Sequence, residues 1–325
     1  MSWMVILTQL ILPLLLLAWL ALFPAGGWLR GLQLISVASI LLAIALTALW
    51  TMPPFWTPYL YALLFVLIVI SQLIKNRVFA RRSAQTSSAN TMITLLVAGL
   101  GILGVYLSYH ALQGRTLPDE QHVDIAPPFA AGHYLVAHGG ASEIINVHLK
   151  TLDKTNPAYQ PWRGQSKALD IFRITPLGLH KDGWQPADPV RYTTFGTGVV
   201  APCNGNIARV VDGIRDMPVP QMDRTHMAGN YIAIDCGEFY IFLAHLRAGS
   251  ILVTSGEQVA IGEPLAEMGN SGNSSEPHLH LHAQRGLPKD SPLGGEPLWL
   301  TINGEFLLRN SRLHITLGDA QLNRK

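Results

Sequence analysis

The first 114 residues constrain the fold most, because they contain no Asp or Glu and only five basic residues. Four apolar runs lie within them, at about 4–23, 31–50, 58–74 and 92–109. Each run is close to the ~20 residues that an α-helix needs to cross the hydrocarbon core of a bilayer. The sequence therefore predicts a membrane region over residues 1–114 with four transmembrane helices.

Two other interpretations of these runs explain less. A secretory signal could account for the first run, but the run lacks a basic region before it and a clear small-residue cleavage site after it. Buried helices of a soluble core could account for one run but hardly for four in succession. The interiors of the four runs contain no Asp, Glu, Lys or Arg. Because ion and proton pathways need such groups, anchoring is a simpler role for this region than transport.

The basic residues of this region predict its orientation. Arg30 lies between the first two runs, and the other four basic residues lie between the third and fourth runs: Lys75, Arg77, Arg81 and Arg82. Loops rich in Lys and Arg stay in the cytoplasm. We therefore expect a multi-pass protein of the cell (inner or cytoplasmic) membrane, with everything after Gly114 on the periplasmic or extracellular side. The basic cluster could instead bind lipid headgroups or nucleic acid, but charges beside a span ordinarily set topology, so we expect no nucleic-acid partner.

The remaining residues, 115–325, are enough for one substantial domain and a connecting arm. Their apolar segments are short and are separated by frequent Gly, Pro, Asn and Asp, which predicts an all-β fold. We expect a membrane-proximal arm and the start of the domain over 115–163, and the main domain over 164–325. The candidate strands are 198–201, 207–211, 231–234, 239–243, 251–253, 264–268 and 278–282.

The most informative motif of this part is Pro277-His278-Leu279-His280-Leu281-His282. Side chains alternate between the two faces of a β-strand, so all three imidazoles would share one face and the leucines the other. Imidazoles grouped in this way suit metal binding and proton transfer. Three solvated histidines on a surface strand are the alternative, although packing seldom requires histidine clusters.

The two cysteines, Cys203 and Cys236, both lie in the part expected outside the cytoplasm. An oxidising compartment would permit a disulfide between them. Two buried thiols acting as small apolar groups are an equal alternative, because the Cα separation decides and the sequence does not contain it.

Three ordered segments resemble the lysostaphin-type (LytM-type) peptidoglycan metallopeptidases. They are Ala168-Leu-Asp-Ile, Leu243-Ala-His-Leu and the long run from Gly262 through Asn270-Ser-Gly-Asn-Ser-Ser-Glu-Pro to His280. The resemblance covers roughly residues 164–286. It implies a β-sandwich or hammerhead-like domain with a duplicated hybrid motif, one zinc ion, and hydrolysis of peptide bonds in cell-wall stems or cross-bridges.

The resemblance also assigns roles to individual residues. Asp170 and His280 match the family's zinc ligands, and His278 and His245 match its catalytic histidines. In this scheme zinc polarises a water molecule and the scissile carbonyl, while one histidine takes the proton and the other stabilises the developing oxyanion.

One position departs from the family pattern, because Ser166 stands where the family has a ligand histidine four residues before Asp170. Two residues could replace the missing ligand. His148, in Asn146-Val-His-Leu, is the candidate we favour; His282, on the same strand face as His280, is an alternative ligand or a second-shell group. We expect the other histidines to be surface or hydrogen-bonded residues: His110, His122, His133, His138, His180 and His226.

We therefore expect a membrane-anchored, zinc-dependent peptidoglycan endopeptidase, with peptidoglycan and the lipid bilayer as partners. A catalytically degenerate domain of the same fold, which binds wall peptides or regulates partner hydrolases, is the alternative. Ser166 is the best support for that alternative. The joint presence of Asp170, His245, His278 and His280 opposes it, since a binding module has no chemical need for this set.

Overall fold

The computed structural model describes residues 2–78 and 87–316. The chain divides into two compact units, Met1–Gln113 and Gly114–Lys325. We call them the helical unit and the β domain and describe each by itself. Two residues of the basic loop, Arg81 and Arg82, lie outside the described residues.

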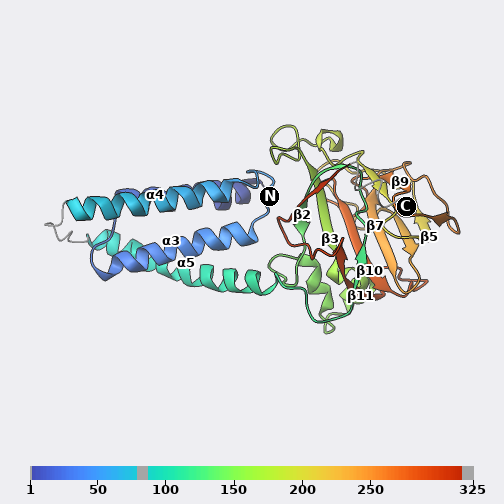
Figure 1. The fold of residues 1–325 in the computed structure, drawn as a ribbon, viewed down its shortest axis with the longest axis horizontal. Helices are drawn as coiled ribbons and strands as arrows, with labels where there is room; N and C mark the ends of the chain where they lie inside the picture. Colours follow the sequence, from blue (N-terminus) through green and yellow to red (C-terminus); the bar gives the residue numbers. More distant parts are fainter. Residues whose placement is uncertain (1, 79–86, 317–325) are drawn as a thin grey trace. The chain divides into compact units, whose positions relative to one another are not determined.

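The helical unit contains four helices that are long and apolar enough to cross a membrane, as the sequence predicts (Figure 1). The first span, Trp3–Leu22, is built from three consecutive helical segments. The elements are α1 (Ser2–Val5), η1 (Ile6–Ile11), α2 (Leu12–Leu22), α3 (Trp28–Thr47), α4 (Thr57–Val78) and α5 (Ser88–Gln113).

Small residues bring helices α3 and α5 together. A Cβ atom at Gly101 or Gly104 would lie 2.9 Å from Ser36 or Ser39, respectively, so only glycine allows this approach. The Ser39 hydroxyl donates a hydrogen bond to the Gly101 carbonyl at 3.1 Å. Because lipid tails are as apolar as side chains, the hydrophobic effect does not drive helices together in a bilayer. Close backbone packing of this kind holds membrane helices together instead.

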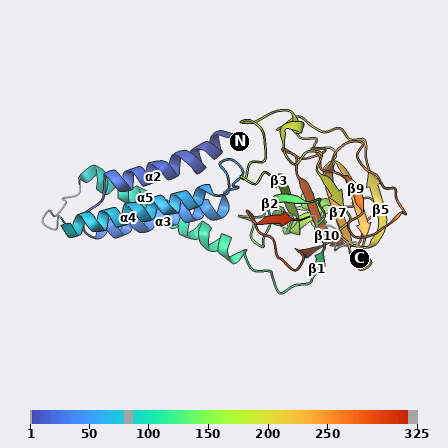
Figure 2. The same ribbon diagram turned by 45° about the horizontal axis from the view of Figure 1, so that its top comes forward.

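The β domain is built on one ten-stranded, mainly antiparallel sheet. Its strands run in the order β12-β2-β3-β10-β7-β6-β5-β8, while β11 pairs with the second half of β10 and β1 pairs in parallel with β11 (Figures 1 and 2). Strands β4 and β9 form a separate pair. The strands are β1 (His122–Ile125), β2 (Gly132–His138), β3 (Leu169–Ile174), β4 (Gly198–Val200), β5 (Gly205–Val211), β6 (Asn230–Asp235), β7 (Tyr240–Leu246), β8 (Gln258–Val259), β9 (Pro264–Glu267), β10 (Leu279–Arg285), β11 (Glu296–Ile302) and β12 (Arg312–Ile315).

This architecture confirms the expected fold class of four apolar helices followed by an all-β domain. The candidate strand at 251–253 is wrong, because that segment makes a single hydrogen bond from Leu252 N to Leu265 O and no ladder. Residues 115–163 contribute β1 and β2 to the sheet and also carry the 3-10 helix η2 (Val147–Leu152). A second 3-10 helix, η3 (Pro157–Lys167), leads into β3.

The core of the β domain lies on one face of strand β10. Leu279, Leu281 and Ala283 are fully buried there, among the apolar side chains of the neighbouring strands. Burial of each leucine contributes about 1.5–3 kcal/mol. The alternation of this segment then places His280 and His282 of β10, and His278 just before it, on the opposite face, as the sequence analysis expects.

A buried ionic cluster anchors the loop that leads into β10. The Glu276 carboxylate accepts hydrogen bonds from His180 Nε2 and Lys181 Nζ, both at 3.0 Å. Burial alone would raise the pKa of Glu276, but the adjacent His180 and Lys181 lower it to about 2. Of the two expectations for His180, a surface residue or a hydrogen-bonded one, the structure shows a buried, hydrogen-bonded residue.

A disulfide joins Cys203, between β4 and β5, to Cys236 at the end of β6. The two Cα atoms are 6.0 Å apart, a separation that a disulfide spans. The sequence leaves open a disulfide or two buried thiols, and the structure shows the disulfide.

Replacing Glu276 with Gln should destabilise the β domain in a pH-dependent way. Lowering the pKa from 4.5 to about 2 corresponds to about 3 kcal/mol at neutral pH. Because the folded-state value is the lower one, this stabilisation is complete above about pH 4.5 and is lost as the pH falls toward 2. Urea unfolding of the full-length protein should show Glu276→Gln less stable than wild type at pH 7 and the difference shrinking at pH 3.

The matched control is Glu267→Gln, which breaks a half-exposed ion pair with Arg247. Exposed pairs contribute about 0–1 kcal/mol, so this variant should stay close to wild type. An equal loss for Glu276→Gln at pH 3 and pH 7 would contradict the assigned role.

Loss of the disulfide should also lower stability. Replacing Cys203 and Cys236 together with Ser frees a loop of 33 residues in the unfolded chain. The free energy of unfolding should fall by about 2–4 kcal/mol. Mass analysis without reductant should show the loss of two hydrogens; two freely alkylated thiols would contradict the bond.

Candidate metal centre

Three neighbouring strands place a row of metal-binding side chains across the sheet. Asp170 of β3 lies directly opposite His280 of β10 and directly opposite His138 of β2. Neighbouring strands are about 4.8 Å apart, so side chains paired in this way on one face are in contact. His280 Nδ1 lies 2.9 Å from Asp170 Oδ1, and His138 Nδ1 lies 2.8 Å from Oδ2.

A β-bulge in β2 brings His138 into this row. Val136 pairs with Ile171, but the next paired residue is His138 with Asp170, so Ala137 is an extra residue. Without it, Ala137 would face Asp170 and His138 would pair with Leu169 on the core side. A bulge of this kind commonly redirects a side chain next to a functional site.

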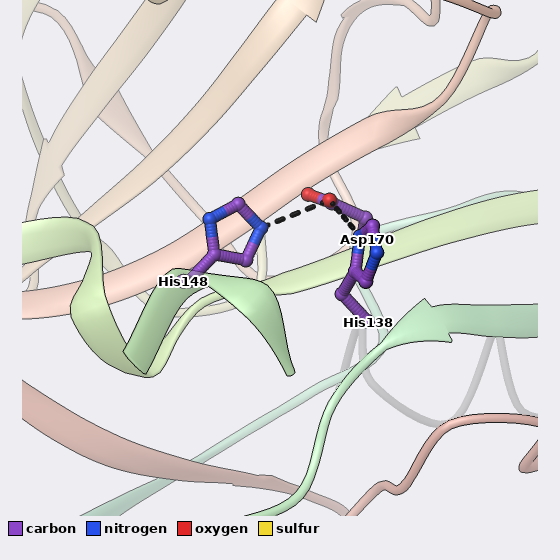
Figure 3. Close-up of side chains that lie close together, drawn as sticks. All are labelled: His138, His148 and Asp170. Atoms are coloured by element: carbon purple, nitrogen blue, oxygen red, sulfur yellow. Dashed lines mark hydrogen bonds and ion pairs between the residues drawn. The ribbon is translucent and has the colours of Figure 1, made fainter. Parts of the chain in front are cut away.

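The 3-10 helix η2 supplies a further imidazole. His148 Nε2 lies 2.9 Å from Asp170 Oδ2, opposite the ring of His138 (Figure 3). The Asn146 side chain caps this helix by accepting a hydrogen bond from the His148 N–H. The Thr151 hydroxyl holds the next turn, since it contacts both the His148 carbonyl at 2.8 Å and the Ser166 hydroxyl at 2.7 Å. Ser166 thus supports the helix that carries His148.

His282 lies behind His280. His282 Nδ1 is 3.1 Å from His280 Nε2, which is the ring nitrogen turned away from Asp170. The His282 ring is fully buried and stacks on Phe242, with the ring centroids 4.7 Å apart. This position suits a residue that supports His280 better than one that contacts a metal beside Asp170.

His278 and His245 are the other two histidines that the sequence analysis names for this site, and each presents one free ring nitrogen to it. His278 Nδ1 donates to the Glu276 carbonyl at 2.8 Å, and His245 Nδ1 donates to the Ser271 carbonyl at 2.9 Å. Because a carbonyl oxygen only accepts, both rings carry their proton on Nδ1 and leave Nε2 free when neutral. His278 Nε2 is 3.5 Å from Asp170 Oδ1, and the rings of His245 and His278 are 4.8 Å apart.

His245 also has an unusual backbone. Its φ is 60°, a left-handed conformation that non-glycine residues rarely adopt. The surroundings hold it there, since the His245 N–H donates to the Ala228 carbonyl at 3.0 Å while its ring is bonded to Ser271. Backbone strain of this kind concentrates at functional sites.

The electrostatics of the cluster favour a single anionic carboxylate among mostly neutral imidazoles. Burial opposes ionisation of Asp170, but His148 and His278 hold the pKa of that carboxyl well below its usual range. Burial lowers the pKa of His138 and His280, and burial together with the nearby His278 lowers that of His245 much further. Burial also opposes the charged form of His278, yet Asp170 outweighs it and raises the His278 pKa.

This cluster lies in a cleft of about 400 Å³ between helices η2 and η3 and the loops before β10. The cleft wall also includes Tyr159, Trp162 and Met227. Neutral imidazole nitrogens and a carboxylate are the ligands that Zn²⁺ prefers when sulfur is absent. The donor set therefore fits a zinc ion.

The structure brings together every site residue that the sequence analysis names. Asp170, His148, His278 and His280 contact one another around the carboxylate, and His245 packs against the ring of His278. The sequence analysis missed His138, which it treats as a surface or hydrogen-bonded residue. The available signal was a histidine ending an apolar strand, but the bulge that redirects it leaves no mark in the sequence. His138, His148 and Asp170 form a possible metal-binding group by ligand-atom distances alone.

Comparisons with known proteins address the same domain. Residues 190–292 match Peptidase family M23, a range that includes His245, His278 and His280 but not Asp170 or His148. The peptidoglycan DD-endopeptidase ShyA of Vibrio cholerae is 32% identical over 151 residues, which cover 46% of this chain and 33% of that protein. The chain thus matches about a third of the length of this relative.

Two solved structures are also similar over part of the chain. A zinc-containing peptidase from Vibrio cholerae is 28% identical, with a TM-score of 0.22 over 28% of this chain and 24% of that one. The catalytic domain of lysostaphin from Staphylococcus simulans is 20% identical, with a TM-score of 0.26 over 38% of this chain and 71% of that one. Likenesses this weak add nothing to the family match. Together with the motifs described above, that match identifies residues 190–292, within the β domain, as a peptidase family M23 domain of the LytM type.

Proposed function

We propose that this chain is a membrane-anchored zinc metallopeptidase that hydrolyses peptide bonds in peptidoglycan stems or cross-bridges. The observation that carries the proposal is the buried Asp170 carboxylate, which has four imidazole nitrogens within 3.5 Å. The peptidase family of the domain supports hydrolysis of a peptide bond. The matched relative is a peptidoglycan DD-endopeptidase, which supports peptidoglycan as the substrate.

Asp170, His148 and His280 are the ligands in this proposal. A catalytic zinc site has three protein ligands and an open position for water, whereas four protein ligands close the site. Of the two imidazoles that contact Asp170 Oδ2, His148 lies against the ring of His280, with the centroids 4.9 Å apart. We therefore assign His148 as the third ligand. His138 then orients the carboxylate as its hydrogen-bond partner.

Bound zinc would activate a water molecule and polarise the scissile carbonyl. The chain's own residues supply the proton transfers. His278 and His245 each present Nε2 to the cleft with Nδ1 fixed by a backbone carbonyl. Burial lowers the pKa of His245, which keeps that ring neutral and able to accept a proton. His278, whose ring lies beside that of His245, would then stabilise the developing oxyanion.

The degenerate, non-catalytic alternative loses its main support. Ser166 is buried and engaged with Thr151 and the Arg163 carbonyl, where it braces the helix that presents His148. The ligand missing from position 166 thus has a replacement from another segment.

Substitution of the ligands should separate zinc binding from catalysis. Asp170→Ala, His280→Ala and His148→Ala should each lose stoichiometric zinc and hydrolysis of purified peptidoglycan, because each removes a donor. His278→Ala and His245→Ala should keep zinc and lose turnover by about 10²- to 10⁴-fold, the usual contribution of a general acid or base. Metal analysis and product release measure the two effects on the full-length protein.

His138→Ala is the matched control for His148→Ala, because both imidazoles contact Asp170 Oδ2. It should retain zinc with an affinity weakened by about 10- to 100-fold. Complete loss of zinc in His138→Ala and retention in His148→Ala would move the third ligand to β2. Full zinc binding in all of the Asp170, His148 and His280 variants would refute the site.

The membrane topology can be tested independently. We expect the loops that contain Arg30 and Arg82 to lie in the cytoplasm. A reporter enzyme that works only outside the cytoplasm should then be active when it is fused after Gly114. A reporter that works only in the cytoplasm should be active when it is fused at Arg82. The opposite pattern would remove peptidoglycan as a substrate.

A further inference from the structure

A buried amide lies on the far side of the metal centre, and its orientation is dictated by its surroundings. Gln284 is fully buried, and one atom of its amide lies 2.7 Å from the carbonyl oxygens of both Gly286 and Pro292. Carbonyl oxygens only accept hydrogen bonds, so this atom is the NH₂ nitrogen. The amide oxygen, Oε1, is then the atom that lies 3.3 Å from His282 Nε2.

This orientation determines the proton positions of His282. Since Oε1 of Gln284 accepts, His282 Nε2 carries a proton and donates it. The ring is fully buried between His280, Gln284 and the face of Phe242, surroundings that disfavour a charged imidazole. A neutral His282 with its proton on Nε2 has a lone pair on Nδ1.

The next ring in line is His280. Its Nε2 lies 3.1 Å from the lone pair on His282 Nδ1, so His280 Nε2 donates a proton there. His280 Nδ1 is then unprotonated, and it faces Asp170 Oδ1 at 2.9 Å. Two acceptors at this distance repel each other unless a cation lies with them, which is the arrangement that a metal ligand requires.

The opposite set of proton positions is unfavourable. It would let His280 Nδ1 donate a hydrogen bond to Asp170. That hydrogen bond would occupy the atoms of both residues that a metal ion has to bind. It would also require Gln284 to turn its oxygen toward the Gly286 and Pro292 carbonyls, placing three acceptors together. The close packing of Gly164 against this amide holds it in place, because a Cβ atom there would collide with Gln284.

We propose that Gln284, acting through His282, is a positioning residue that sets the tautomer of His280 and so prepares it to bind zinc. The inference rests on the proposed function for the ligand role of His280. It extends that proposal by giving a role to two buried side chains that touch neither metal nor substrate. It also explains why His282 is buried although its contacts with His280, Gln284 and Phe242 include no carboxylate.

The test uses the full-length protein in detergent micelles, labelled with ¹⁵N-histidine and freed of metal by chelation. Long-range ¹H–¹⁵N spectra report which ring nitrogen carries the proton. In wild type, His280 and His282 should both be protonated on Nε2. In His282→Phe and Gln284→Met, which preserve the bulk of each side chain, His280 should shift toward protonation on Nδ1, and zinc affinity should fall by about 10- to 100-fold in a chelator competition.

His282→Gln provides the rescue, because its amide oxygen can accept from His280 Nε2 while its nitrogen donates to Gln284. This variant should return both the His280 tautomer and the zinc affinity close to wild type. Thr301→Val is the structural control, since it removes a buried hydrogen bond to Asp124 in the same sheet. It should lower the melting temperature without changing either readout.

A His280 protonated on Nδ1 in metal-free wild type would overturn the proposal. Unchanged zinc affinity in both His282→Phe and Gln284→Met would overturn it too, as would a His282→Gln variant that behaves like His282→Phe. The tautomer is read without zinc, so it is independent of the proposed function, which fails separately if Asp170→Ala and His280→Ala retain zinc.

Discussion

The burial of one carboxylate, Asp170, is the constraint on which the site depends. A buried anion is costly unless it is paired and hydrogen-bonded. Here the pairing comes from the sheet, since β2 and β10 each place an imidazole directly opposite Asp170 on β3. A shift of any of these strands by one residue would move its side chain to the core face. The register of the sheet therefore determines which imidazoles lie beside Asp170 in the candidate metal centre.

Three imidazoles of this cluster are oriented through their second ring nitrogen. Backbone carbonyls of the loops before β10 take the Nδ1 protons of His278 and His245, and the buried His282 faces the outer nitrogen of His280. A ring oriented in this way loses little freedom when it binds a metal or transfers a proton. The ionic cluster of Glu276 with His180 and Lys181 anchors the loop whose carbonyl orients His278 in the cleft.

The proposed third ligand, His148, comes from a different segment than the position at which the family has its ligand histidine, which Ser166 occupies here. Ser166 lies in the 3-10 helix η3, four residues before Asp170, whereas His148 lies in the 3-10 helix η2. Ser166 remains useful, since its hydroxyl now contacts Thr151 and fixes the turn that follows His148. The bulge in β2 brings a further imidazole, His138, to the same carboxylate oxygen, and the contact of His148 with the His280 ring distinguishes the two.

The sequence by itself determined the features that depend on local composition and periodicity. Apolar runs of the right length specify the four helices, and strict alternation puts His278, His280 and His282 on one face, because each pattern acts within a single segment. The tertiary structure decided what depends on contacts between distant segments. Packing across the domain produces three such features. They are the bulge that turns His138 toward Asp170, the 3-10 helix that carries His148, and the 6.0 Å separation of the Cα atoms of Cys203 and Cys236, which the disulfide joins. The sequence of a single segment does not predict such contacts, because the register of the strands and the approach of the 3-10 helix are set only when the strands pair.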